Sequence, residues 1–138
     1  MFEENHGQEY LPGDNEQNYC GGTTDNMLAL NYKGEIYTCI RYMESSLNGK
    51  QKPLIIGDID QGYLSTEEYQ NNHKILENIT RRSQSTDECY YCPIASGCSW
   101  CSAYNYEING TPNKRLTYTC LMHKTRILAN VYYWNKLY

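Results

Sequence analysis

The chain has 138 residues, fewer than the roughly 200 of a full α/β barrel, so we expect one small domain. Its formal net charge of −4 argues against a nucleic-acid binder, which usually carries a basic surplus. No apolar run approaches the roughly 18 residues of a membrane span, and the acidic, polar start is unlike a signal peptide. Seven cysteines are the outstanding number in so short a chain.

The first half of the chain predicts a lead-in followed by a β-hairpin. Residues 1–19 are polar, contain Pro12 and Gly13 and show no apolar periodicity, which is typical of a linker. Cys20 follows, and the glycines at 21 and 22 allow close backbone approach to a bulky group. A strand is then expected from Met27, a turn at 33–34 and a return strand over 35–38, with Cys39 at its end. Alternation would place one set of apolar side chains on a single face: Leu28, Leu30 and Tyr32.

Further along, the sequence predicts a short strand and two helices. Residues 54–59 indicate a buried strand. The Ser-Thr-Glu-Glu run at 65–68 has capping-box spacing, with Ser65 as N-cap of a helix reaching about Thr80. Residues 89–101 are expected to be irregular, and the pattern is helical again after Cys120. We therefore expect a small, cysteine-rich α+β domain. The buried face of its first helix would carry Tyr69, His73, Leu76 and Ile79.

The cysteine spacing is typical of metal or cluster ligation. Four cysteines fall within 13 residues, and they form two Cys-x-x-Cys pairs, 89/92 and 98/101. An odd cysteine count without a signal peptide argues against a secreted disulfide protein, which remains the third possibility. A [4Fe–4S] cluster needs about four thiolates, and cysteines two residues apart can reach neighbouring irons from one turn.

Zinc is the rival metal, because two Cys-x-x-Cys pairs could bind one tetrahedral ion. Five residues separate the pairs here, whereas zinc sites usually have about 15 or more. One zinc ion would also leave three of the seven cysteines unused. Iron–sulfur ligation is therefore the preferred hypothesis, and a zinc-stabilised module that binds a peptide or protein is the alternative.

The order of these residues resembles a known family. Cys20, a glycine five before Cys39, the cysteines of the 89–101 loop and Cys120 look like the seven-cysteine signature of the SPASM domain. That domain is the auxiliary, C-terminal part of radical S-adenosylmethionine enzymes that mature peptides and proteins. The hairpin sequence at 28–39 and the Ile-Gly-Asp-Ile segment at 56–59 also resemble the family. We assign residues 20–138 to this domain. One departure is that two residues separate Cys98 from Cys101, where the family usually has three.

The resemblance implies two [4Fe–4S] clusters. Carried over position by position, the first cluster would bind Cys20, Cys39 and Cys101. The second would bind Cys89, Cys92, Cys98 and Cys120. Since there is no eighth cysteine, the first cluster has an open corner. That corner could hold a substrate group, or be capped by water, Asp25, His6 or a residue of another domain.

The implied function is electron transfer or substrate positioning in a cytoplasmic oxidoreductase that matures ribosomally made peptides. The family's catalytic Cys-x-x-x-Cys-x-x-Cys motif is absent, so this chain would not cleave S-adenosylmethionine by itself. It would be a fragment of a larger enzyme or a freestanding remnant. Its expected partners are a radical S-adenosylmethionine catalytic domain, in the same or a separate chain, and a precursor peptide. Neither nucleic acid nor a membrane is expected.

Two histidines and several aromatic residues are further candidates for roles around the cysteines or in the core. His123 follows Cys120 by three residues, but a surface or capping role is commoner than ligation at a helix start. His73 is expected to pack in the core. Aromatic residues around the cysteine loop could shield clusters from water, form the small core, or do both: Tyr90, Tyr91, Trp100, Tyr104 and Tyr106.

Overall fold

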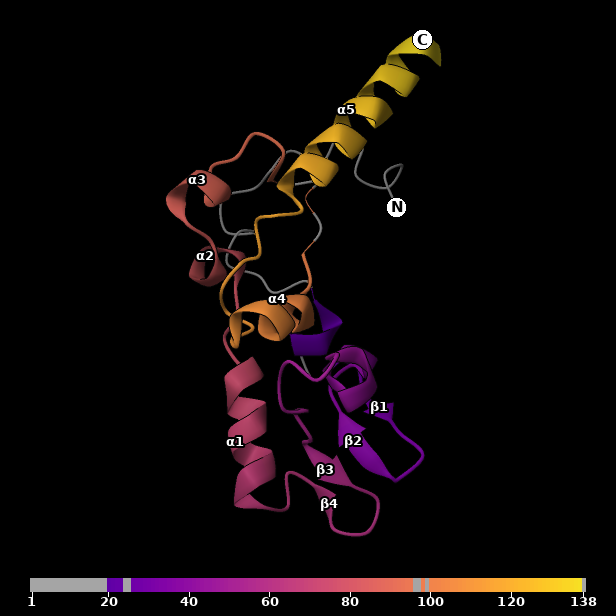
Figure 1. The fold of residues 1–138 in the computed structure, drawn as a ribbon, viewed down its shortest axis with the longest axis vertical. Helices are drawn as coiled ribbons and strands as arrows, with labels where there is room; N and C mark the ends of the chain where they lie inside the picture. Colours follow the sequence, from indigo (N-terminus) through magenta and orange to yellow (C-terminus); the bar gives the residue numbers. More distant parts are fainter. Residues whose placement is uncertain (1–19, 24–25, 96–97, 99, 138) are drawn as a thin grey trace.

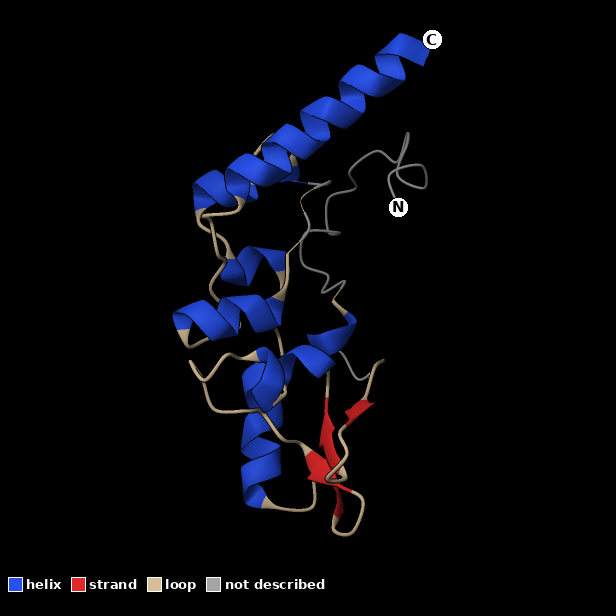
Figure 2. Ribbon diagram, turned by 45° about the vertical axis from the view of Figure 1, so that its right-hand side comes forward, coloured by secondary structure: helices blue, strands red, loops and turns tan. Residues whose placement is uncertain are grey.

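The computed structural model of the chain describes residues 20–23, 26–95, 98 and 100–137. The predicted lead-in at 1–19 lies outside these residues. A small sheet and helix α1 (Glu67–Leu76) form one end of the molecule, and helix α5 (Cys120–Leu137) projects from the other (Figures 1 and 2). Helix α4 (Ser102–Asn109) lies between them. The fold is α+β, as predicted.

The sheet has four short antiparallel strands in the order of the sequence: β1 (Ala29–Leu30), β2 (Glu35–Tyr37), β3 (Gly57–Asp58) and β4 (Gly62–Tyr63). The predicted hairpin is confirmed, because Ala29 pairs with Tyr37 across β1 and β2. Gly34 turns the chain at φ +83°, a left-handed conformation that glycine adopts without strain.

The apolar face of the hairpin points away from the interior. Tyr32 is 93% exposed, and Leu28 and Leu30 are exposed as well. The buried side chain is Tyr37, and its cross-strand neighbour Ala29 packs against the core. The core therefore lies on the side of β1 that carries Ala29, and not on the side of the exposed Leu30.

The predicted strand over 54–59 is only partly regular. Strand β3 is limited to Gly57–Asp58, and Ile59 is exposed. Leu54 and Ile56 are buried as expected. The Ile56 N–H donates to the Ile36 carbonyl oxygen (2.9 Å), which continues the hydrogen bonding to β2 without a full ladder.

Helix α1 begins and ends at other residues than predicted. Its N-cap is Thr66, whose hydroxyl accepts from the Tyr69 N–H, whereas the Ser65 hydroxyl donates to the Gly62 carbonyl. The helix ends at Leu76, and Asn78 takes a left-handed φ of 58°. Thr80 then caps a separate helix, α2 (Arg81–Gln84), through a capping box with its own third residue. A second cap therefore divides the one long helix that was predicted.

The cysteine loop is more regular than expected at its start. Helix α3 (Asp87–Tyr90) contains Cys89, whose N–H is capped by Thr86. Helix α4 ends at Asn109, and Gly110 is its C-cap at φ +73°. The predicted C-terminal helix is confirmed as α5. None of its residues is buried, and in the described part of the chain no helix combines the length and apolarity needed to cross a membrane.

The core lies where α4 meets the loop segments after β2. Three 3-10 helices shape this region: η3 (Gly21–Thr23), η4 (Ile40–Tyr42) and η5 (Glu44–Ser46). Helix α4 packs against both η3 and η4. The Tyr42 and Tyr106 rings pack with their centroids 6.1 Å apart. The buried residues of this core are Tyr37, Tyr42, Leu47, Leu54, Leu76, Ala103 and Tyr106.

Candidate metal centre

All seven cysteines lie within the described residues, are half-buried and form no disulfide. Three of them lie at the N-terminal ends of short helical segments. Cys20 directly precedes η3, Cys39 is the N-cap of η4, and Cys101 is the N-cap of α4. Because α4 packs on η3 and η4, these three cysteines are neighbours in space although they are far apart in the sequence.

Tyr42 lies among these three sulfurs. Burial raises the pKa of its hydroxyl strongly, and negative charge on Cys20, Cys101 and Cys39 raises it further. We name Cys20, Cys39 and Cys101 the first cysteine group. They are the residues that the family resemblance assigns to one cluster; that they bind one stays a prediction.

Two buried hydroxyl groups form a hydrogen-bonded chain, here called the hydroxyl relay, that ends beside a sulfur of the first cysteine group. The Tyr42 hydroxyl donates to Ser102 Oγ (2.7 Å), and Ser102 Oγ lies 3.7 Å from Cys20 Sγ. Since Ser102 Oγ accepts from Tyr42, its own hydrogen can point to the sulfur. Both Tyr42 and Ser102 are buried, so the relay is shielded from water.

Gly22 lies against two sulfurs of the same group. A Cβ added at Gly22 would stand 2.9 Å from Cys39 Cβ. It would also stand 3.6 Å from Cys39 Sγ and 3.7 Å from Cys20 Sγ. The close approach inferred from the two glycines after Cys20 is therefore an approach to the cysteines themselves.

Two of the remaining cysteines, Cys89 and Cys98, lie near Cys120 at the start of α5. Burial raises the pKa of the Cys120 thiol, and negative charge on Cys89 and Cys98 adds to this effect. Arg115 and Lys124 act in the opposite direction on the same thiol. The Cys92 N–H donates to the Cys89 carbonyl (3.3 Å), which ties that cysteine to α3. We name Cys89, Cys92, Cys98 and Cys120 the second cysteine group.

Each group has a nitrogen donor on one sulfur. The Arg41 backbone N–H donates to Cys39 Sγ in the first group (3.5 Å). Arg115 Nη2 donates to Cys98 Sγ in the second (2.8 Å). Hydrogen bonds of this kind favour a thiolate over a thiol, and sulfurs that bind iron commonly accept them. The donor sets thus fit an iron–sulfur cluster chemically.

The sulfurs do not converge on one point. In the described residues, which include all seven cysteines, no group of three or more His, Cys, Asp or Glu side chains could hold a metal ion. A zinc ion needs its thiolates at about 2.3 Å from a single centre. Each thiolate of a four-iron cluster binds a different iron, so a cluster needs neighbouring sulfurs around a larger volume.

The histidines take other roles. The prediction that His73 packs in the core is wrong: its side chain is half-buried, with Nδ1 3.0 Å from Glu77 Oε1 and the ring edge-on against Tyr63. Burial lowers the pKa of His123, with Arg126 and Arg115 adding to the effect, which favours the neutral imidazole. The residues considered for the open corner of the first cluster, His6 and Asp25, lie outside the described residues.

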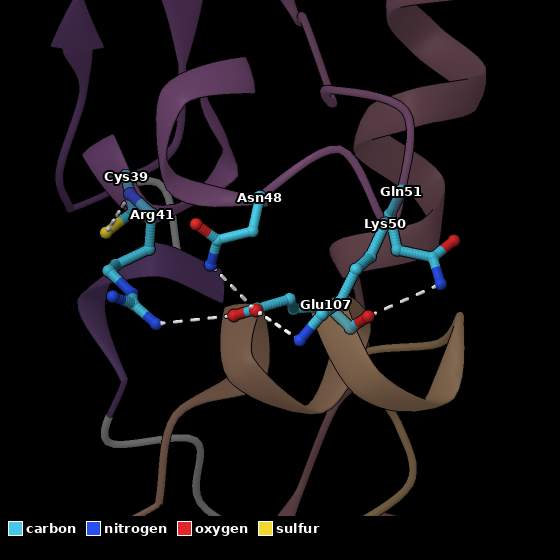
Figure 3. Close-up of polar contacts among 6 residues, drawn as sticks. All are labelled: Cys39, Arg41, Asn48, Lys50, Gln51 and Glu107. Atoms are coloured by element: carbon cyan, nitrogen blue, oxygen red, sulfur yellow. Dashed lines mark hydrogen bonds and ion pairs between the residues drawn. The ribbon is translucent and has the colours of Figure 1, made fainter.

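Sequence reasoning missed Glu107, which is buried at 4% exposure in α4. Its carboxylate accepts from Asn48 Nδ2 (3.0 Å) and Lys50 Nζ (3.1 Å), and Arg41 Nη2 lies 3.8 Å away (Figure 3). Gln51 Nε2 donates to the Glu107 carbonyl (3.4 Å). Hydrogen bonds from Asn48 and Lys50 hold the pKa of the carboxyl below its usual value.

This network positions the first cysteine group. Arg41 follows Cys39 by two residues and contributes both the backbone donor to its sulfur and the guanidinium near Glu107 (Figure 3). Glu107 belongs to the helix that Cys101 caps. The carboxylate therefore joins the segments that carry two of the three cysteines. Its partners are about 60 residues away in the sequence, and no local pattern marks them.

Of the two roles expected for the aromatic residues near the cysteines, the structure shows core packing for one of them. Tyr106 is in the core. The Tyr90 and Tyr91 rings pack edge-on with centroids 5.0 Å apart, and the Arg82 guanidinium lies 4.7 Å from the Tyr90 centroid. Tyr91 is 74% exposed, so it does not shield sulfur from water.

Comparisons with family models, with curated proteins and with solved structures find no match for this chain.

Proposed function

We propose that this chain is an auxiliary iron–sulfur domain that binds two [4Fe–4S] clusters. The observation that carries the proposal is that Cys20, Cys39 and Cys101 lie around Tyr42, while Cys89 and Cys98 lie near Cys120. The first group would supply three thiolates and the second would supply four, which is the complement for one closed cluster and one with an open corner. The spacing of these cysteines in the sequence supports the same division.

The clusters would supply one-electron chemistry. The residues of this chain would position the clusters and form the surroundings of their sulfurs. Tyr42 and Ser102 shield the first group from water and donate hydrogen bonds toward it. Glu107 holds the segments of Cys39 and Cys101 together. An open corner in this group would leave room for a substrate atom, which is the positioning role that the proposal includes.

The wider setting follows from the family resemblance. In it, the domain serves a radical S-adenosylmethionine enzyme that modifies a ribosomally made peptide. The domain would accept an electron from the substrate radical or position the peptide. A catalytic domain, in the same or another chain, would bind and cleave S-adenosylmethionine.

The test is anaerobic purification, reconstitution with iron and sulfide, and assay of iron, sulfide and zinc. We expect a brown protein with about eight irons per chain. A double variant in each group, C39A/C101A or C89A/C98A, should retain about four irons. The two variants are matched controls for each other, since each leaves the other group intact. One or two zinc ions and no iron would instead support a zinc-stabilised binding module and contradict the proposal.

A further inference from the structure

The two cysteine groups differ in the charge of their sulfur donors. In the first group, Cys39 accepts from a neutral backbone N–H, and the neutral Ser102 hydroxyl lies 3.7 Å from Cys20 Sγ. In the second group, Cys98 accepts from the cationic guanidinium of Arg115. Charge-assisted hydrogen bonds are roughly twice as strong as neutral ones.

Arg115 is held in place by buried amides. Its backbone N–H donates to the Gln84 carbonyl (2.9 Å), and the next N–H, of Leu116, donates to Asn105 Oδ1 (3.0 Å). Asn105 Nδ2 in turn donates to Gln84 Oε1 (2.9 Å). Gln84 and Asn105 are both buried, so the segment that carries Arg115 is fixed against α2 and α4. The guanidinium is therefore presented to Cys98 by a rigid support.

Among the described residues, no carboxylate forms an ion pair with Arg115, and its side chain donates to the Cys98 sulfur. Lys124 adds a second cation that acts on Cys120 of the same group. In the first group, the guanidinium of Arg41, which follows Cys39 by two residues, lies instead 3.8 Å from the Glu107 carboxylate.

We propose that Arg115 is a positioning residue that raises the reduction potential of the cluster bound by the second cysteine group, so that this cluster is reduced before the first. The inference rests on the proposed function. Reduction adds one electron and hence one negative charge to a cluster, and a neighbouring cation with hydrogen bonds to sulfur stabilises that charge. No bond forms or breaks in this step, and the electron comes from the chemical titrant.

The experiment is an anaerobic redox titration of the reconstituted full chain with dithionite, followed by electron paramagnetic resonance. The two double variants assign the two redox waves. C39A/C101A should lack the wave of the first cluster, and C89A/C98A should lack that of the second. In the unsubstituted chain, the wave absent from C89A/C98A should have the more positive potential. If that wave has the more negative potential, the proposal is wrong. This test uses the unsubstituted chain and needs no Arg115 variant.

A variant comparison then isolates the guanidinium. In R115Q, we expect the second wave to shift negatively by at least tenfold in the equilibrium constant, or about 59 mV for one electron, while the first wave stays in place. R115K should recover part of the shift because it keeps the charge. K136Q removes an exposed lysine near the C-terminal end of α5, away from Cys120, and should move neither wave.

The outcomes separate this inference from the proposed function. Equal shifts of both waves in R115Q, or equal shifts in R115Q and K136Q, would overturn the role of Arg115 while leaving the two clusters intact. Loss of the second cluster in both R115Q and R115K would show a structural role and would also overturn it. A chain that takes up no iron would contradict the proposed function, and this inference with it.

Discussion

The two cysteine groups differ in the packing of the residues around them. The first group surrounds Tyr42, a fully buried residue of the core, and is joined to α4 by the buried Glu107 network. The second group lies around short α3 and the start of α5, a helix with no buried residue. Core packing therefore holds the first group, whereas the second depends on local turns and on charge.

This difference has consequences for how each group should respond to change. Substitutions in the core should affect the fold and the first group together. Changes around the second group should leave the free energy of unfolding nearly unchanged, since its surrounding contacts are more exposed.

The largest expected effect comes from removing the Tyr42 side chain. Y42A should lower the free energy of unfolding by about 3–5 kcal/mol, because it leaves a cavity beside Tyr106 and removes the donor to Ser102. The measurement is an anaerobic urea titration. Y91A, at a 74% exposed tyrosine, is the matched control and should change the free energy by about 0.5 kcal/mol or less. Equal losses in the two variants would remove the distinction between the groups.

Gly22 gives a sharper test, because it touches only the first group. In G22A the new methyl group would stand 2.9 Å from Cys39 Cβ, so Cys39 must move away from Cys20. We expect a loss of about 1–3 kcal/mol and selective loss of the first cluster, with about four irons retained. Iron assay after reconstitution measures this. Retention of about eight irons would indicate that Gly22 does not define the spacing of these sulfurs.

Glu107 should make the stability of this region depend on pH. At pH 7, E107Q should lower the free energy of unfolding by about 1–3 kcal/mol, since it weakens the hydrogen bonds from Asn48 and Lys50. The pKa of Glu107 is lowered in the folded state. Its stabilising contribution is therefore present above the ordinary carboxyl pKa of about 4.3 and is lost as the pH falls through the lowered value.

The measurement for Glu107 is a pair of urea titration series from pH 7 downward. The difference between the unsubstituted chain and E107Q should shrink below about pH 4. E68Q is the matched control, because Glu68 pairs with Lys52 at an exposed site. A difference that stays constant with pH would show that the Glu107 charge is not what joins the two segments.

The smallest effect is expected beside the second group. Arg82 Nη1 lies 2.8 Å from Asp87 Oδ1, and both side chains are exposed. D87N should therefore lower the free energy of unfolding by about 0–1 kcal/mol, with both clusters retained. Urea titration and iron assay are the measurements. A loss comparable with that of E107Q would contradict the view that exposed contacts contribute little here.

The sequence predicted those features that depend on neighbouring residues. Gly34 permits the turn of the hairpin, and the apolar pattern after Cys120 predicted a helix. The predicted start of the first helix was wrong by one residue. Ser65 and Thr66 are adjacent and both carry a hydroxyl that could cap the helix, and Thr66 is the one that does. The face of the hairpin was also undetermined, since alternation defines two faces but not which one meets the core.

Only the tertiary structure decided which cysteines are neighbours and what surrounds them. The spacing of the cysteines indicated a ligand set, but Ser102 meets Cys20 across 82 residues and Tyr42 across 60. Arg115 and Cys98 are 17 residues apart, with a helix between them. Such contacts depend on how α4 packs against η3 and η4, and packing is a property of the whole core rather than of any short stretch of the chain.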